Sequence, residues 1–367
     1  MDRGLRDRLQ ASGAVFDALS GEALHFGRPA AELDAALDRC ALVDRGMLGR
    51  LLASGPDLLS LLNRLSTAKL DSLAVGQGVT TVVTTAKGRI VERLFVHRLA
   101  DRSVLLVSGA GAAPRVVAYL DRFTFAEQTG LDDVSAKTGQ LSVVGPRAAE
   151  ALAAAGLPRP LPAASVVAEL GGVEMHVLGQ DGLSTAGYSV FLPAGVAGDA
   201  WRLLREATER CGGLPAGTSA AEAWRVLHGL PAPGHELTED YNPLEAGLYD
   251  AVSFAKGCYV GQEVVARLNT YDKVSRSLVG LVFDRSIELP AAGTPLYHDG
   301  REAGVLTSAV TPPGRNRSIA IGYLKRRAAG AGAELFVGAS ESALRARVVD
   351  LPFPDAAGRR NGASRSS

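Results

Sequence analysis

The sequence predicts an α+β protein of two or three domains that ends in a small antiparallel β-domain. Its 367 residues exceed one average domain of roughly 150 residues, and 47% of them are hydrophobic, so the chain can bury a sizeable core. Before about residue 273, strand-like and helix-like segments are mixed without regular βαβ alternation, which favours α+β over a doubly wound sheet. From Leu278 onward, short strand-like segments separated by Gly, Pro and Asp turns indicate a small barrel or sandwich.

The first elements follow from amphipathic and leucine-rich patterns. Residues 1–28 begin as a charged amphipathic segment, which predicts an N-terminal helical extension, and a second helix is expected over 30–40. The segment 47–55 is typical of a strand. Pro56 occupies a position that a first helical turn tolerates, and the leucine stripe after it predicts a helix over 57–65.

A β-rich region follows, in which residues 89–99 alternate between apolar and polar side chains with a period of two. A proline-rich linker over 156–165 is expected to join two lobes of this region. The other elements expected before the C-terminal domain are strands 79–85, 103–109, 140–145, 166–170, 173–179 and 187–192 and helices 114–122, 146–155, 196–210 and 218–228.

These segments divide the chain into four parts. The extension over 1–28 precedes a two-lobed α+β region over 29–273, and a barrel domain over 274–353 precedes a tail over 354–367. The tail is polar and rich in Gly, Ser and Arg, so it is expected to be disordered.

Composition argues against several classes of function. Thirty-nine Lys and Arg residues balance 39 Asp and Glu residues, so the chain lacks the global positive charge that favours nucleic-acid binding. No stretch approaches the ~20 apolar residues of a membrane-spanning helix. Cys40, Cys211 and Cys258 are far apart and the six histidines lack ligand spacing, so no metal site is expected. A charged N-terminus without an apolar core, together with few cysteines, predicts a cytoplasmic protein.

The segment SFAKGCYVGQEVVARLNTYDKVSR, residues 253–276, is the strongest candidate for chemistry. Gly257 permits a tight backbone path, and Gly261 is expected to start a helix over 262–268. Cys258 stands just before this helix and two residues after Lys256, and both a helix N-terminus and a cation favour the reactive thiolate. The alternative is that Cys258 is a small buried apolar residue.

The octapeptide K-G-C-Y-x-G-Q-E (Lys256–Glu263), followed by V-A-R, resembles the signature of the YgfZ family. These folate-binding proteins are implicated in iron–sulfur cluster assembly or repair and are related to the glycine-cleavage T-protein, an aminomethyltransferase. Weaker matches at 225–231, 238–248 and 303–309 occur in the family's order. The resemblance implies a ring of three subdomains around a central cavity for tetrahydrofolate or a derivative, the third subdomain being the C-terminal barrel.

The resemblance also implies residues that contact the folate. Either Arg225 or Arg267 would hold the carboxylates of the glutamyl tail, unless each forms a structural ion pair instead. Tyr259 would line the cavity or pack in the core, and Gln262 would bond a ligand amide or cap the helix. Glu263 would orient Lys256 or a backbone amide, or remain solvated.

Two departures from the transferase pattern speak against aminomethyl transfer. The acidic segment of T-proteins corresponds here to G-R-I-V-E-R (88–93), which places Glu92 and Arg93 at the acidic pair. Glu92 would serve as the acid or base, held ionised by its arginine neighbour. The T-protein G-Y-E appears as Gly187-Tyr188-Ser189, so Tyr188 is retained as a folate contact whereas the pterin-binding carboxylate is missing.

The sequence thus supports three hypotheses. The first is a folate-dependent maintenance factor for iron–sulfur proteins, with Cys258, Lys256 and Glu92 as its catalytic residues and client or assembly proteins as partners. One thiol cannot hold a cluster alone, so partner cysteines would be needed. The second is an aminomethyltransferase that uses Glu92. The third is a folate-dependent tRNA-binding or tRNA-modification factor with a basic patch at 325–327.

Overall fold

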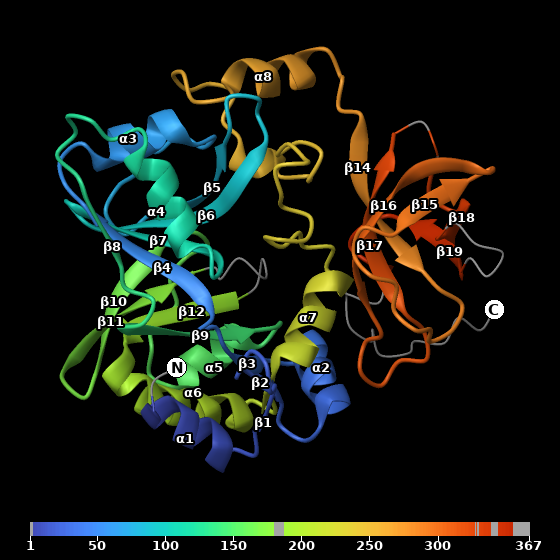
Figure 1. Ribbon diagram of the computed structural model, residues 1–367. Helices are drawn as coiled ribbons and strands as arrows, with labels where there is room; N and C mark the ends of the chain where they lie inside the picture. The colour runs from blue at the N-terminus through green and yellow to red at the C-terminus, as the bar shows by residue number, and fades with distance from the viewer. Residues whose placement is uncertain (1–2, 180–186, 327, 329, 339–343, 355–367) are drawn as a thin grey trace, which may run out of the picture.

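The computed structural model describes residues 3–179, 187–326, 328, 330–338 and 344–354. The chain forms three lobes, two built on open β-sheets and one on a closed barrel (Figure 1). The predicted α+β class with a C-terminal antiparallel barrel is confirmed. The tail predicted over 354–367 lies outside the described residues after Pro354. Within the described ranges, no helix is long and apolar enough to cross a membrane.

The first lobe is a sheet with strand order β10-β11-β12-β9-β3-β13, covered on one face by helices α1, α5 and α6. Leu141 of β9, Val190 of β12 and the fully buried Trp201 of α6 belong to the core between sheet and helices. The bounds are α1 (Arg3–Ala11), β3 (Ala41–Asp44), β9 (Thr138–Val144), α5 (Ala148–Ala154), β10 (Ser165–Leu170), β11 (Val173–Leu178), β12 (Gly187–Pro193), the 3₁₀ turn η1 (Ala194–Val196), α6 (Ala197–Arg210) and β13 (Leu214–Pro215).

The second lobe is a sheet with strand order β5-β6-β7-β4-β8, and α3 and α4 cover its outer face. Leu94 and Val96 of β6 point towards these helices, because side chains two apart on a strand share a face. The bounds are β4 (Leu48–Ser54), α3 (Leu58–Leu65), β5 (Gly78–Thr84), β6 (Ile90–Ala100), β7 (Ser103–Ala110), α4 (Ala113–Asp121) and β8 (Gly130–Asp133).

The third lobe is a closed barrel of order β14-β17-β16-β15-β18-β19. It packs against the first lobe through α2 and α7, whose apolar residues share one core with Ile319 and Ile321 of β17. Helix α8 and an extended segment lead from the second lobe to the barrel (Figure 1). The bounds are α2 (Pro29–Asp38), α7 (Thr218–Leu227), η2 (Tyr249–Ala251), α8 (Gln262–Thr270), β14 (Arg276–Val282), β15 (Pro295–His298), β16 (Arg301–Val310), β17 (Ile319–Lys325), β18 (Glu334–Val337) and β19 (Leu344–Val349).

The first two lobes are interleaved in sequence, which differs from the predicted junction over 156–165. Strand β3 belongs to the first sheet, the chain then builds the whole second sheet, and β9 returns to pair with β3. The proline-rich linker joins α5 to β10 within the first lobe. Its end also touches the second lobe, because the Gly78 amide donates to the Ala163 carbonyl oxygen at 2.5 Å.

The extension over 1–28 is helical only in its first part. Helix α1 packs on α6, and a short hairpin of β1 (Val15–Phe16) and β2 (Ala23–His25) follows. Gly13 and Gly21 flank the first strand with positive φ values of 88° and 70°, which end the helix and permit the hairpin turn. The hairpin carries the chain towards α7, which contacts β2.

The inner faces of the two sheets meet in a small apolar core that contains Leu105 and Phe191. Buried His97 of β6 also lies on the inner face, and its Nδ1 has no hydrogen-bond partner among the described residues. Burial, together with a smaller effect of His176, lowers the pKa of His97 from 6.5 to about 4.

His97 should therefore make the fold acid-sensitive. The unfolded chain binds a proton at this site between pH 6.5 and 4, whereas the folded chain does not, so stability falls as the pH falls through this window. The difference corresponds to about 3 kcal/mol. Urea denaturation of wild type and His97→Gln gives the free energy of unfolding at pH 7 and pH 4. We expect this free energy to fall less between the two pH values in the variant than in wild type. An equal fall in the free energy of unfolding of both proteins would contradict the role of His97 in acid sensitivity.

Candidate functional site

A cavity of about 220 Å³ lies where the inner faces of both sheets meet helix α7. Strands β3, β4, β6 and β7, the turn between β3 and β4, the turn of the N-terminal hairpin and the turn after α7 supply the rest of its wall. Its apolar lining includes Val43, Met47, Leu48, Phe95, Leu230 and Pro233, and its charged lining comprises Glu22, Asp44, Arg45, Arg93, Glu222 and Arg225. Flat apolar walls with a few converging polar groups are typical of small-molecule sites.

Helix α7 forms one wall because its residues recur at helical spacing. Thr218, Ala221, Glu222 and Arg225 fall on one face of the helix and all line the cavity. Strand β7 lines the cavity at Gly109. A Cβ added at Gly109 would lie 2.6 Å from Pro233. The absence of a side chain there lets the turn after α7 approach the sheet closely.

The two residues at the family's acidic pair point to opposite faces of β6. Arg93 lines the cavity beside Phe95, and its guanidinium carbon lies 4.9 Å from the centre of the Phe95 ring. The Nε of Arg93 is buried and has no hydrogen-bond partner among the described residues. Burial lowers the pKa of Arg93 to about 10, opposed by Glu92, so the side chain remains a cation at neutral pH.

Glu92 points to the outer face, under α4, and is absent from the lining of the cavity. Its side chain is 0% exposed and its Oε2 accepts a 2.6 Å hydrogen bond from Nη2 of Arg115. The Oε1 accepts from the amides of Arg93 and Gly109 at 3.2 and 3.4 Å. The arginine that pairs with Glu92 is thus Arg115 and not the predicted Arg93, because adjacent strand residues face opposite ways.

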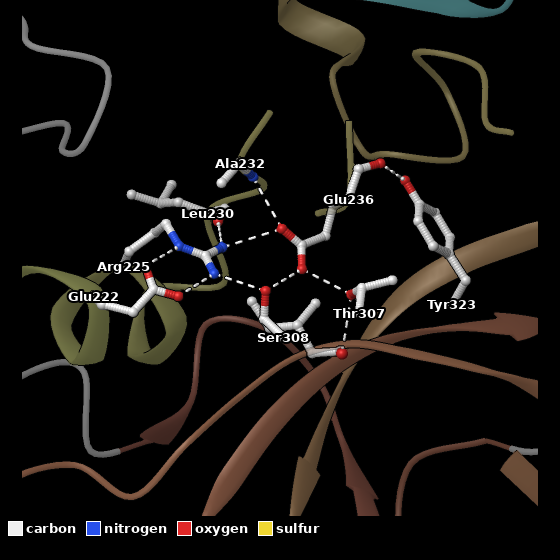
Figure 2. A network of polar contacts seen from close by, with 9 residues as sticks. Glu222, Arg225, Leu230, Ala232, Glu236, Thr307, Ser308 and Tyr323 are labelled. Atoms are coloured by element: carbon white, nitrogen blue, oxygen red, sulfur yellow. Dashed lines mark hydrogen bonds and ion pairs between the residues drawn. The ribbon is translucent and has the colours of Figure 1, made fainter. Parts of the chain in front are cut away.

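Arg225 also reaches the cavity, but its donors are used within the protein (Figure 2). Nε and Nη2 bond the Glu222 carboxylate at 2.8 and 2.6 Å, and Nη1 donates to the Leu230 carbonyl oxygen and to Glu236. Nη2 donates a further bond to Ser308. A guanidinium has five N–H groups, and these contacts account for all five. Arg225 therefore forms part of the wall and has no donor left for a ligand.

Glu236 is the centre of this network, which Figure 2 shows between α7 and the barrel. Its side chain is 0% exposed and accepts hydrogen bonds from Arg225, the Ala232 amide and the hydroxyls of Thr307 and Ser308. The Tyr323 hydroxyl donates to the backbone oxygen of Glu236. The network joins the turn after α7 to strands β16 and β17 and fixes the barrel beside the cavity.

The opposite end of the cavity is acidic. Glu22, from the hairpin of the extension, and Asp44, at the end of β3, both line it. Burial raises the pKa of Glu22, and the neighbouring Asp44 raises it further, whereas Arg45 lowers it. Burial also raises the pKa of Asp44, against the hydrogen bond from the Gly46 amide.

Lys256 of the octapeptide is a structural brace. Its Nζ donates to the carbonyl oxygens of Asn63, Ser66 and Ala68 at 2.6, 2.8 and 2.5 Å, which uses all three ammonium protons. The Asn63 and Ser66 carbonyls lie at the end of α3, where a helix leaves backbone oxygens without partners, and the Ala68 carbonyl follows just after it. Burial lowers the pKa of Lys256 to about 8. The side chain thereby ties the octapeptide loop to the second lobe.

The other residues of the octapeptide lie outside the cavity described above. The predicted helix is confirmed as α8, preceded by Gly261 with φ 87°. Cys258 is exposed, whereas Cys40 and Cys211 are buried. Tyr259 is buried and its ring centre lies 5.2 Å from the Lys256 Nζ. Gln262 is partly buried at the start of α8.

Three further predicted residues also lie elsewhere. Exposed Glu263 and Arg267 line a separate surface cavity of about 200 Å³ beside α8. Tyr188 lines a cavity of about 90 Å³ next to the proline-rich linker. Ser189, its neighbour, points between the sheets and shares a hydrogen bond of 2.7 Å with Ser142.

The basic patch predicted over 325–327 is compensated where it is described. Lys325 donates to the Glu302 carbonyl oxygen at 2.8 Å, and Arg326 forms an ion pair with Asp272. Arg327 lies outside the described residues.

Sequence reasoning missed Glu22, Glu236 and the orientation of Arg93. Leu94 and Val96 mark one face of β6, and alternation along the strand puts Glu92 on that face and Arg93 on the other. This pattern could have shown that the two side chains point in opposite directions. No local pattern marks Glu22 or Glu236, because their positions depend on contacts with distant lobes.

Comparisons with known proteins agree with this architecture. A family described as GCVT N-terminal domain matches residues 5–256, and the glycine cleavage T-protein C-terminal barrel domain matches residues 276–355. An aminomethyltransferase of Moorella thermoacetica is 32% identical over 326 residues, which cover 86% of both chains. A putative chloroplastic transferase of Arabidopsis thaliana is 29% identical over 365 residues, or 96% of this chain and 80% of the relative.

The fold agrees equally well with a solved structure. The crystal structure of glycine cleavage system aminomethyltransferase T from Bartonella henselae superposes with a TM-score of 0.82 at 24% identity, over 95% of this chain and 97% of that chain. The expected T-protein type of architecture is confirmed. With both family domains matched in order and relatives aligned over most of its length, the chain belongs to the glycine cleavage T-protein family.

Proposed function

We propose that this protein binds a reduced folate in the cavity beside α7 and supports iron–sulfur proteins in the manner of the YgfZ family, whose signature its octapeptide resembles. The observation that carries the proposal is the exchange at the acidic pair, where a cation faces the cavity and the remaining carboxylate is held on the other face of β6. The scattered cysteines fit a reducing compartment such as the cytoplasm.

The residues of the cavity suit a folate. Phe95, Met47 and Val43 offer apolar surface for a flat bicycle, and Arg93 offers a buried Nε without a partner for an anion. Charge-assisted bonds from arginine to a carboxylate are among the stronger hydrogen bonds in proteins. When bound, a reduced folate supplies one-carbon units or reducing equivalents. The protein's own residues would orient it and exclude water.

The same geometry argues against aminomethyl transfer. An acid or base must come within hydrogen-bond reach of the reacting nitrogen. Both oxygens of Glu92 are already engaged outside the cavity, and the guanidinium of Arg93 does not release a proton at neutral pH. The cavity therefore offers binding groups rather than a transferable proton at this strand.

The proposed role for Cys258 rests on its exposure. Lys256 holds the loop in place through α3, so the thiol is presented on an anchored segment. In this role Cys258 acts as a thiolate towards a partner protein that supplies the remaining ligands of a cluster. We place the reaction at the surface of the loop and the folate in the cavity.

Titration with tetrahydrofolate and folinate tests the proposal. Trp224 lies on α7, whereas Trp201 is buried in the core of the first lobe, so binding should change the emission of Trp224. We expect a saturable response that Trp224→Phe removes while calorimetric binding persists. The absence of saturable binding would overturn the proposal, and so would formation of methylenetetrahydrofolate from an aminomethyl-loaded lipoyl carrier.

The role of the thiol is checked in the same experiment series. Native protein should alkylate at Cys258 first, because Cys40 and Cys211 are buried and burial raises the pKa of Cys40 to about 11. In cells that lack the protein, wild type should restore cluster-containing enzymes and Cys258→Ala should not. Restoration by the variant would remove Cys258 from the proposed function.

A further inference from the structure

The cavity beside α7 has two ends of opposite charge. Glu22 and Asp44 meet the N-terminal end of α7 at Thr218, and a smaller adjoining cavity shares these three residues. Arg93, Gly109 and Pro233 line only the larger cavity, and Gly109 lies against Pro233, which follows the C-terminal end of α7. The lining follows α7 from Thr218 to Arg225, which is about 10 Å at 1.5 Å per residue.

The charged groups at the two ends have few protein partners. The Arg93 guanidinium contacts the Phe95 ring, and its buried Nε has no hydrogen-bond partner among the described residues, although the carboxylates of Glu92 and Glu236 lie near enough to favour its charge. The Glu22 carboxylate is half-buried and lies near the negative charge of Asp44, which Arg45 of the same cavity offsets only in part. By contrast, Arg225 and Glu222 between these ends neutralise each other.

Such an arrangement fits a ligand with complementary ends. A buried guanidinium nitrogen without a hydrogen-bond partner costs free energy that an anion would recover, and a carboxylate beside a second carboxylate gains from hydrogen-bond donors. The apolar side chains of Val43, Met47 and Phe95 leave the middle of the cavity suited to a flat, uncharged ring system.

We propose that Arg93 binds the anionic arm of the ligand and that Glu22 of the N-terminal extension binds the amidine-like edge of its heterocycle. This proposal rests on the proposed function for the identity of the ligand, a reduced folate. Its glutamyl carboxylate is the anion and the amino-pyrimidinone edge of the pterin supplies the donors. Glu22 then replaces, from a separate segment, the carboxylate that is missing at Ser189, and the extension is a binding element.

Two fragments of folate allow the two ends of the cavity to be tested separately. p-Aminobenzoylglutamate carries the anionic arm without the pterin, and a tetrahydropterin carries the bicycle without the arm. We would measure binding of folinate and of both fragments by calorimetry to wild type, Arg93→Met and Glu22→Gln. Each variant controls for general damage in the other.

We expect a crossed pattern. Arg93→Met should weaken folinate roughly 10–100-fold and abolish binding of the arm fragment, while the tetrahydropterin changes less than about twofold. Glu22→Gln should weaken folinate and the tetrahydropterin and spare the arm fragment. Its thermal midpoint should not fall, because burial and Asp44 disfavour the Glu22 carboxylate more than Arg45 favours it, so that the pKa of Glu22 is raised.

The experiment distinguishes a wrong assignment of the two ends from a failure of the proposed folate binding. A wild-type protein that binds folinate, with variants that weaken both fragments equally or in the reversed pattern, would overturn the assignment of the two ends. A wild-type protein that binds neither folinate nor either fragment would overturn folate binding itself.

Discussion

Glu236→Ala is expected to lower the free energy of unfolding by about 3–5 kcal/mol, the typical cost of removing one partner from a buried ion pair. The variant leaves the Arg225 guanidinium, 5% exposed, without its buried counter-ion. It also removes the acceptor for Thr307, Ser308 and the Ala232 amide. Because these groups come from the barrel and from the turn after α7, we expect the barrel to loosen from the other lobes.

Glu222→Ala is the matched control. Glu222 binds the same guanidinium as Glu236, but its side chain is 44% exposed, so water can replace it. We expect a loss of at most about 1 kcal/mol for this variant. Urea denaturation of both variants, followed by circular dichroism, gives the two values. Equal losses would show that burial of Glu236 contributes nothing beyond the ion pair.

Gly261→Ala should also destabilise the protein strongly, and it should do so through the octapeptide. Gly261 has φ 87°, a conformation that costs other residues about 1–2 kcal/mol. An added Cβ would lie 2.5 Å from the Thr85 carbonyl oxygen and 3.0 Å from the Cα of Gly88. Both atoms belong to the backbone of the turn between β5 and β6, so the contact cannot be relieved by a change of rotamer.

Gly257→Ala is the control within the same octapeptide. A Cβ at Gly257 would meet no atom within 4 Å, and its φ is not in the left-handed region. We expect this variant to unfold within about 0.5 kcal/mol of wild type. Thermal unfolding and the rate of Cys258 alkylation should both change in Gly261→Ala and stay constant in Gly257→Ala. Similar behaviour of the two variants would contradict the close approach at Gly261.

Elements with a strong local pattern were predictable from the sequence. The strand expected over 89–99 is β6, Ile90–Ala100, and the helix expected over 262–268 is α8, Gln262–Thr270. Both depend on short-range periodicity and on a glycine that permits one backbone path. The hairpin after α1 escaped prediction because strands of two and three residues carry no measurable period.

The site was less predictable, since its properties depend on contacts between distant segments. The sequence places Glu92 beside Arg93, whereas the register of β6 sends one to α4 and the other to the cavity. Arg225 has the residue type expected for a carboxylate ligand, but Glu236 and Ser308 occupy its donors only after the barrel has docked. The junction over 156–165 was wrong for the same reason, because pairing of β3 with β9 is a long-range contact.

The interleaved path of the chain has a consequence for biogenesis. Strand β3 leaves the ribosome more than ninety residues ahead of β9, the first of its two sheet neighbours to be made, and β13 follows later still. At 5–20 residues per second, its edge stays open for roughly 5–20 s during synthesis. The nascent chain therefore holds an apolar strand, Ala41–Asp44, with both edges open to chaperones or to self-association until the second sheet has been made, and with one edge open until β13 is made.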